Sequence, residues 1–432
     1  MFLTPLKNTM DARREDDMMN PRNAILAAIT IMASTAAMTA QAADYIKCTG
    51  TSGKTIYTNL PFMCADAAKQ AQEATKAALA AQAAKEAAAK AAAEKAAAEA
   101  KAAAEKAAAV KAAAAAVKAN ALTTDAVFSA DSFWYTPIPK DVELHPHTAQ
   151  YTQEFLRQKK AYYNTVNINT SKWSSPVYVA DSKTAPVRVN QWDCQKKGYK
   201  DSGLLTQWAS VPVPSYAVPA EGTDMEMTVY QPSTDTVWEF WKAKKENGVW
   251  YACWGGRLEN ASKSNGVFYK YYGTTATSLP FLGGQITAEE LARGEIKHVI
   301  GISMVDLEHW NIFSWPANRS DGWNSNKVAY RIAEGQRFRL DPTIDVDKLN
   351  LTKVGKIVAK AAQTYGFVVW DKAGSISLRA QNVYSYTKLG KENPYPALFE
   401  NKPNYAVLNN FPWESLQFLP TDYGKPAETA SK

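Results

Sequence analysis

Residues 236–255 read Thr236-Val-Trp-Glu-Phe-Trp-Lys-Ala-Lys-Lys-Glu-Asn-Gly-Val-Trp-Tyr-Ala-Cys-Trp-Gly255. The Asn247-Gly248 pair in the middle favours a two-residue hairpin turn, because both residues adopt positive φ angles at little cost. β-branched and aromatic residues, which are common in strands, flank this turn on both sides. The stretch therefore predicts that residues 237–241 pair with residues 250–254, within a domain built mainly from strands.

Strand alternation divides the aromatic side chains of this hairpin between two faces. It places Glu239 and Trp241 on one face, and Trp238 and Phe240 on the other. One face is expected to be core, and the other offers a platform on which a sugar ring stacks beside a carboxylate. The alternative is a pair of packed sheets in which tryptophan fills both layers. The pattern leaves both interpretations open.

The rest of the C-terminal region also reads mainly as strands. They are expected at residues 223–230, 298–305, 336–340, 366–371 and 375–380, with Lys372-Ala373-Gly374 joining the last two. Two helices are expected: a short one that opens with the capping box Thr287-Ala-Glu-Glu290 and ends at Gly294, and one over residues 352–365. Many strands with few inserted helices favour a mainly β fold, a large β-sandwich of jelly-roll or lectin-like type.

Chemistry-bearing residues fall in three of these segments and in one loop. A lone histidine on an apolar strand, such as His298, is more often a hydrogen-bonded core residue than an acid or base. The loop at residues 315–322 contains Arg319 and Asp321, and two interpretations are open. Either Arg319 neutralises a substrate carboxylate while Asp321 accepts a proton, or the two side chains form an ion pair that stabilises the loop. The candidate catalytic residues are Glu239, Asp224, His298 and Arg319, and the candidate ligand-binding residues are Trp241, Trp254, Tyr230, Trp315 and Asp321.

Long motifs run through this region. They are Asp131-Ser-Phe-Trp134 with Pro137-Ile-Pro139, Gly222-Thr-Asp224, Gln231-Pro-Ser-Thr-Asp235-Thr-x-Trp238-Glu239-Phe240-Trp241, Gly255-Gly256-Arg257, Trp315-Pro-Ala-x-Arg319-x-Asp321-Gly322 and Arg337-Phe-Arg339-Leu340-Asp341-Pro342. Together they resemble a family of exported bacterial proteins, frequent in actinobacteria, that has no assigned reaction. The resemblance covers most of residues 131–415 and implies homology, but it carries no activity over to this chain.

The N-terminus, residues 1–42, reads as a preamble followed by an export signal. Arg22 precedes an apolar run at residues 24–37, and Ala40-Gln41-Ala42 fits signal peptidase, so cleavage is expected after Ala42. The run of about 14 residues is shorter than the roughly 20 that cross a bilayer. No other segment has 18 uninterrupted apolar residues, so the mature chain is expected to lack a membrane span and to be periplasmic or secreted.

Residues 43–64 predict a small β-hairpin module. The chain has four cysteines and no Cys-x-x-Cys pair, so bridges Cys48–Cys64 and Cys194–Cys253 are the economical pairing in an oxidising compartment, and no zinc site is expected. The first bridge would explain how a hairpin this small stands alone. The module's motifs are Tyr45-x-x-Cys48, Gly53-Lys54-x-x-Tyr57-Thr58 and Pro61-x-x-Cys64, and they resemble a small N-terminal domain of unknown function in exported proteobacterial proteins. That resemblance implies export, not activity.

Residues 65–120 are mostly alanine with lysine and glutamate, which favours a helix because alanine has the highest helix propensity. Large apolar residues are too few to form a coiled-coil seam, so a monomer is expected. The segment is interpreted as a spacer resembling the alanine-lysine-glutamate rods of Tol-type envelope proteins; the alternative is a frayed linker. It would separate the hairpin module from the large domain at residues 121–432.

Charge and motifs exclude several functions. A net charge of +7 over 432 residues is weak support for nucleic-acid binding, and no such partner is expected. The chain has no Gly-x-Ser-x-Gly elbow, phosphate-binding loop or His-Glu-x-x-His pair. Asp341, Asp345 and Asp347 lack the glycine and terminal glutamate of a calcium loop. No metal or cofactor is therefore expected.

Three functions remain open. The first is an exported protein that presents a glycan-binding β domain, with a polysaccharide or cell-envelope glycan as its partner. The second is a polysaccharide-degrading hydrolase or lyase that uses a carboxylate such as Glu239 or Asp224, or a His298/Arg319 pair. The third is a structural envelope protein without a small ligand.

Overall fold

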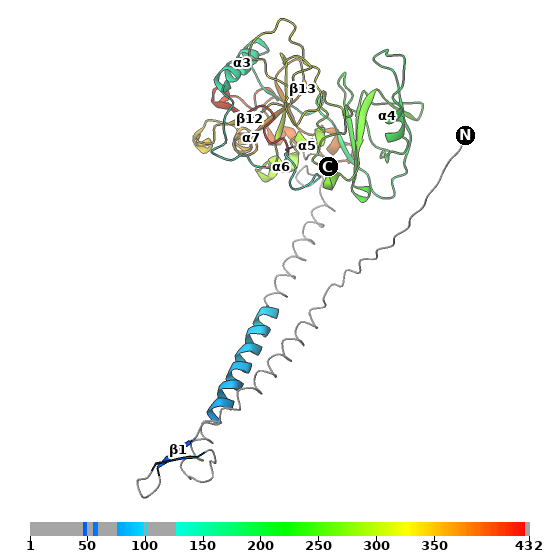
Figure 1. Cartoon of the computed structure of the whole chain (residues 1–432). Helices are drawn as coiled ribbons and strands as arrows, with labels where there is room; N and C mark the ends of the chain where they lie inside the picture. Colours follow the sequence, from blue (N-terminus) through cyan, green and yellow to red (C-terminus); the bar gives the residue numbers. More distant parts are fainter. Residues whose placement is uncertain (1–45, 50–54, 59–75, 99–100, 102–126, 428–432) are drawn as a thin grey trace, which may run out of the picture. The chain divides into compact units, whose positions relative to one another are not determined.

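The computed structural model of the chain describes residues 46–49, 55–58, 76–98, 101 and 127–427 (Figure 1). Contacts divide the chain into two units, residues 1–108 and 109–432. The predicted signal peptide lies outside the described residues. So does Cys64, and with it the predicted bridge to Cys48.

The first unit contains the predicted hairpin. Strands β1 (Ile46–Thr49) and β2 (Thr55–Thr58) pair antiparallel, with Ile46 opposite Thr58. Residues 76–98 are helical, and every side chain among them is exposed. The ends of the predicted spacer lie outside the described residues, so its full length stays a prediction.

The second unit is mainly β. Within residues 127–427, thirteen strands form three sheets, and each sheet mixes parallel and antiparallel pairs. The four-stranded sheet has the order β10 (Trp254–Leu258), β7 (Thr236–Trp241), β6 (Met227–Gln231), β4 (Val177–Val179). The six-stranded sheet has the order β15 (Leu416–Phe418), β12 (Arg337–Leu340), β13 (Phe367–Lys372), β11 (Ile300–Met304), β14 (Ser377–Arg379), β3 (Asn167–Asn169). The three-stranded sheet has the order β5 (Val189–Gln191), β9 (Val249–Ala252), β8 (Lys244–Glu246).

The longer helices lie beside these sheets. The predicted capping box starts α6 (Ala288–Arg293), which ends at Gly294 with φ of 89°. Helix α7 (Lys353–Thr364) follows the predicted boundaries to within a residue. Helix α3 (Thr148–Ala161) was not predicted, because its buried positions include Thr152, Glu154 and Gln158 and leave little apolar periodicity. The remaining α-helices among the described residues are α4 (Ser202–Gln207), α5 (Phe281–Gly284), α8 (Tyr384–Thr387) and α9 (Tyr395–Leu398).

The aromatic hairpin is predicted only in part. Its turn is right and Trp241 pairs with Trp254, but Trp250, Tyr251 and Ala252 do not pair with β7. Asn247 and Gly248 have φ of 49° and 82°, but they join β8 to β9. The chain leaves β7 at Lys242, whose φ is 52° and whose N–H donates to the Asp224 carbonyl at 2.7 Å. Strand β7 therefore pairs with β6 and β10 rather than with β9.

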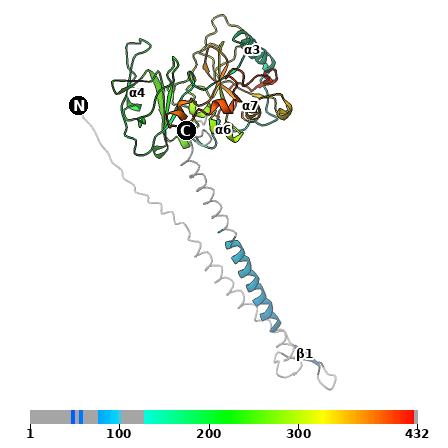
Figure 2. The same ribbon diagram turned by 180° about the vertical axis from the view of Figure 1, so that it is seen from behind.

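Apolar clusters bury both faces of β7. On one face, Trp238 and Phe240 belong to a cluster with Trp208 and Leu204 of the α4 segment. On the other face, Val237 belongs to a second apolar cluster. That second cluster also contains Trp370 of β13, so it joins the four-stranded and six-stranded sheets. Helix α4 lies on one side of this unit and α3 and α7 on the other, both in Figure 1 and from behind in Figure 2.

Candidate functional site

A pocket of about 560 Å³ lies where the four-stranded sheet, the six-stranded sheet and four loop segments meet. Five of the nine candidate residues line it, namely Asp224, Trp241, Trp254, Arg319 and Asp321. The other lining residues are Gln195, Lys197, Tyr199, Asp201, Glu226, Tyr271, Thr274, Ala276, Ser320, Asp371 and Lys372. Segments more than 170 residues apart in the sequence thus contribute to one site.

Two tryptophans form the aromatic side of this pocket. Trp241 and Trp254 are direct partners in the β7–β10 ladder, so their side chains lie on the same face of the sheet. The Trp254 ring stacks on Tyr272 with 6.1 Å between centroids, and Lys197 Nζ lies 5.3 Å from its centroid. Trp241 Nε1 donates to Asp224 Oδ1 at 3.0 Å. Both rings are only half-buried.

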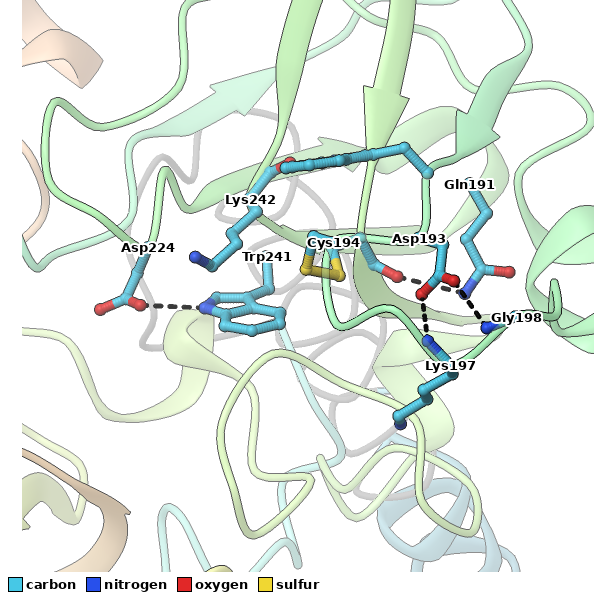
Figure 3. The surroundings of a disulfide bond; sticks show 10 residues. Gln191, Asp193, Cys194, Lys197, Gly198, Asp224, Trp241 and Lys242 are labelled. Carbon is cyan, nitrogen blue, oxygen red and sulfur yellow. Dashed lines mark hydrogen bonds between the residues drawn. A yellow bond between two sulfur atoms is a disulfide. The ribbon is translucent and has the colours of Figure 1, made fainter.

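The Cys194–Cys253 disulfide, predicted from the cysteine count, holds a loop against these tryptophans. Figure 3 shows the disulfide between Trp241 on one side and Asp193 and Lys197 on the other. The Asp193 carboxylate accepts the backbone N–H groups of Lys197 at 2.8 Å and Gly198 at 2.7 Å, which closes the loop. This loop supplies Gln195, Lys197 and Tyr199 to the pocket.

A buried arginine joins two carboxylates of the pocket. Arg379 Nη1 donates to Glu226 Oε1 at 2.5 Å, and Nη2 donates to Asp371 Oδ2 at 3.0 Å. The guanidinium also lies 4.5 Å from the centroid of the Phe281 ring. Burial would lower the pKa of Arg379, but Glu226 and then Asp371 raise it above its ordinary value. Arg379 is therefore charged and neutralises both carboxylates.

The second oxygen of Glu226 differs from the first. Glu226 is 2% exposed and lines the pocket, yet its Oε2 has no hydrogen-bond partner among the described residues. Burial raises the pKa of Glu226 to about 7, against the opposing effect of Arg379. Burial likewise raises the pKa of Asp371 to about 6. In both groups burial therefore favours the protonated form, a feature common among acid–base residues.

Arg319 and Asp321 reach the pocket without a salt bridge between them in the described part of the chain. The Arg319 guanidinium donates to the carbonyl of Thr275 at 2.6 Å, to the carbonyl of Gly273 at 3.1 Å and to Ser278 Oγ at 3.1 Å. Burial lowers the pKa of Arg319 and raises that of Asp321. The loop is thus held by backbone carbonyls rather than by the ion pair considered above.

Glu239 lies beneath the pocket instead of lining it. Alternation places it on the face of Trp241 as predicted, but it is fully buried. Its carboxylate accepts from Thr274 Oγ1 at 2.8 Å and from the Leu282 N–H at 3.1 Å, and burial raises its pKa to about 7. Since Thr274 lines the pocket, Glu239 positions it rather than meeting a ligand.

Three other candidates lie away from the pocket. His298 is fully buried; its Nδ1 contacts the Val299 carbonyl at 2.8 Å and its Nε2 lies 3.2 Å from Glu290, so the core interpretation holds for it. It does not share the pocket with Arg319. Tyr230 is buried in the cluster between the two sheets. Trp315 lines a different cavity, of about 760 Å³.

Glu226, Asp371 and Arg379 were missed as site residues. Each is a charged residue within or beside an otherwise apolar strand segment. That pattern is a usable signal, because a buried charge is costly unless it is paired. The sequence does not predict which of these charged side chains pair with one another, because the three residues come from distant segments around β6, β13 and β14.

The described residues were also compared with the requirements of a metal site and of a membrane-spanning helix. No group of three histidine, cysteine, aspartate or glutamate side chains there is arranged to hold a metal ion. None of the helices in those ranges has the length and apolar composition of a membrane span.

Comparison of the chain with protein-family models, curated proteins and solved structures found no match. The resemblances of residues 43–64 and 131–415 to exported bacterial proteins therefore stay predictions. The chemistry of the pocket itself is the basis for assigning a function.

Proposed function

We propose that the pocket binds a glycan. The observation that carries the proposal is the pair Trp241 and Trp254, which lie half-buried on one face of the β7–β10 ladder and line a pocket with carboxylates and Arg319. Sugar rings present apolar C–H faces, which pack on indole, and hydroxyl groups, which hydrogen-bond to charged side chains. A concave site with an aromatic side and a few converging polar groups matches both needs.

The charge of the pocket favours a neutral or amino-sugar glycan. Its lining contains five carboxylates (Asp201, Asp224, Glu226, Asp321 and Asp371) and three cations (Lys197, Arg319 and Lys372), and Arg379 neutralises Glu226 and Asp371. The pocket therefore offers a polyanionic glycan no excess of cations. The positive net charge of the whole chain, +7, therefore does not describe the site.

The wider proposal is an exported, monomeric protein, periplasmic or secreted, that holds this domain on the spacer at residues 65–120. The Cys194–Cys253 disulfide supports export, because disulfides persist in oxidising compartments. The apolar cluster shared by the four-stranded and six-stranded sheets supports sheet-on-sheet packing, and hence the β-sandwich of jelly-roll or lectin-like type.

Trp254→Ala should weaken glycan binding by about 1–3 kcal/mol, roughly 5- to 150-fold in Kd, because it removes a stacking face. A glycan array with the full chain would identify ligands, and calorimetry would compare the variants. Trp323→Ala is the matched control, since Trp323 is 61% exposed and lies outside the pocket. An equal loss in both variants would contradict the assignment, and an absence of any bound glycan would favour a structural envelope protein.

A second candidate function is hydrolysis of the bound glycan. It is favoured by the environment of the Glu226 carboxyl group. Its Oε2 is unpartnered in the described part of the chain, and a pKa of about 7 supplies a proton donor at neutral pH. The acid would protonate the leaving glycosidic oxygen while a second carboxylate, such as Asp371 or Asp224, activates water. The lyase alternative uses the same groups to abstract a proton. Glu239, the earlier candidate, would act only through Thr274.

Under this candidate function, Glu226→Gln should retain binding but lower turnover by about 10²- to 10⁴-fold, because an amide does not donate the proton. Release of reducing ends from a glycan found on the array would be the measurement. Glu239→Gln, which alters a carboxylate outside the pocket, should keep most of the turnover. Catalysis would be ruled out if the wild-type protein releases no product from glycans that it binds.

A further inference from the structure

A second pocket, of about 780 Å³, adjoins the first. Asp224 and Lys372 line both pockets. Arg379 lines the second pocket while its guanidinium binds Glu226 and Asp371 of the first. The two cavities therefore meet at these charged side chains. Together their volumes exceed the roughly 1,000 Å³ at the upper end of pockets for a single small ligand.

The strands under the second pocket have one polar and one apolar face. Strand β3 lies at the edge of the six-stranded sheet and pairs parallel with β14. Ile168 and Leu378 are fully buried in the core, whereas Asn167, Asn169 and Ser377 line the pocket. Asn167 Nδ2 donates to Ser375 Oγ at 3.3 Å, but the Asn169 side chain makes no hydrogen bond within the described part of the chain. Its amide is thus available to a ligand.

Aromatic side chains are also exposed at this second pocket. Trp173 is 45% exposed and Tyr405 is 55% exposed, and both line it. Apart from the charges at the junction, namely Asp224, Lys372 and Arg379, every lining residue is uncharged. Exposed aromatic rings beside amides and hydroxyls are the same combination that suits sugar rings in the first pocket.

We propose that the two pockets are subsites of one groove, so that the ligand is a chain of several neutral sugar units crossing Asp224 and Lys372. The inference rests on the proposed function. It places any bond cleavage at the junction, next to Glu226 and Asp371, with sugar units bound on both sides. A long glycan would then bind more tightly than a short one, because it gains contacts in the second pocket without a second association cost.

The test uses the full chain with two neutral oligosaccharide series, cello-oligosaccharides and chito-oligosaccharides, from one to six units. Affinity for at least one series should rise about tenfold or more once the oligomer outgrows the first pocket. Trp173→Ala should weaken binding of six units about tenfold and leave the shortest bound oligomer unchanged. Trp254→Ala should weaken both lengths, and Trp323→Ala neither. Melting temperatures would verify that each variant folds. Little change is expected for Trp173→Ala and Trp323→Ala, because both side chains are exposed.

The outcomes separate the two proposals. If Trp254→Ala weakens binding but Trp173→Ala does not, or if affinity is independent of length, the extended groove is wrong and the single pocket stands. If neither series binds, or if Trp254→Ala has no effect on binding, both the neutral glycan and the groove are wrong.

Discussion

Replacing Arg379 by methionine should lower the free energy of unfolding by about 3–5 kcal/mol, the cost of leaving buried charges without a partner. Arg379 is 3% exposed and donates to Glu226 and Asp371, which have no other cation within salt-bridge distance in the described residues. Methionine fills similar apolar volume beside Phe281, so the loss reports charge rather than packing. Urea denaturation of the wild type and the variant near neutral pH would measure this difference in the free energy of unfolding.

The pH dependence distinguishes this electrostatic role from lost packing. Arg379 lowers the pKa of both Glu226 and Asp371, so its removal raises those pKa values further above their unfolded values. A carboxyl whose folded pKa is raised contributes stability at low pH and loses it as pH rises through that pKa. The variant should therefore be less destabilised at pH 5 than at pH 8.

A triple variant provides the control for this prediction. Combining Arg379→Met with Glu226→Gln and Asp371→Asn removes the unpaired charges and should recover most of the lost stability. A loss that is independent of pH, and not recovered in the triple variant, would show that the arginine acts through its shape alone.

Replacing Cys194 and Cys253 by serine should lower the free energy of unfolding by about 4 kcal/mol. The disulfide closes a loop with a sequence separation of 59 residues, and cross-links of this length restrict the unfolded chain by about that amount. The same change should weaken glycan binding, because the loop that carries Gln195, Lys197 and Tyr199 loses its anchor to the strand region. Denaturation and calorimetry would measure the two effects.

The matched control for the disulfide is Cys48→Ser with Cys64→Ser. Those cysteines belong to the other unit of the chain, so this variant should leave the main unfolding transition and glycan affinity unchanged. Equal midpoints for the wild type and the Cys194/Cys253 variant would contradict a stabilising role for the disulfide.

Local features of the fold were predictable because neighbouring residues decide them. The positive φ angles at Asn247 and Gly248 follow from their side chains, and the capping box at Thr287 and Glu290 joins atoms three residues apart. Strand alternation placed Glu239 with Trp241 on one face, as the ladder has it.

Strand pairing was less predictable, because it joins distant segments. The Lys372-Ala373-Gly374 turn follows β13 as expected, yet β11 lies between β13 and β14 in the sheet. Similarly, Lys242 adopts a positive φ angle that a lysine rarely prefers. Trp254 still pairs with Trp241 of β7, but Trp250, Tyr251 and Ala252, also expected to pair with β7, lie in another sheet. Contacts with the rest of the domain outweigh local preference at both places.

By itself, the sequence determined the mainly β class, the helices α6 and α7, the Cys194–Cys253 pairing and five residues of the pocket, since each of these depends on residue type and short-range pattern. The tertiary structure alone decided which faces are covered and which charges meet. It buried Glu239, His298 and Tyr230, and it brought Arg379 between Glu226 and Asp371. The physical reason is that burial and ion pairing depend on segments far apart in the chain. Strand alternation predicts which side chains share a face of a strand, but not which segment packs against that face.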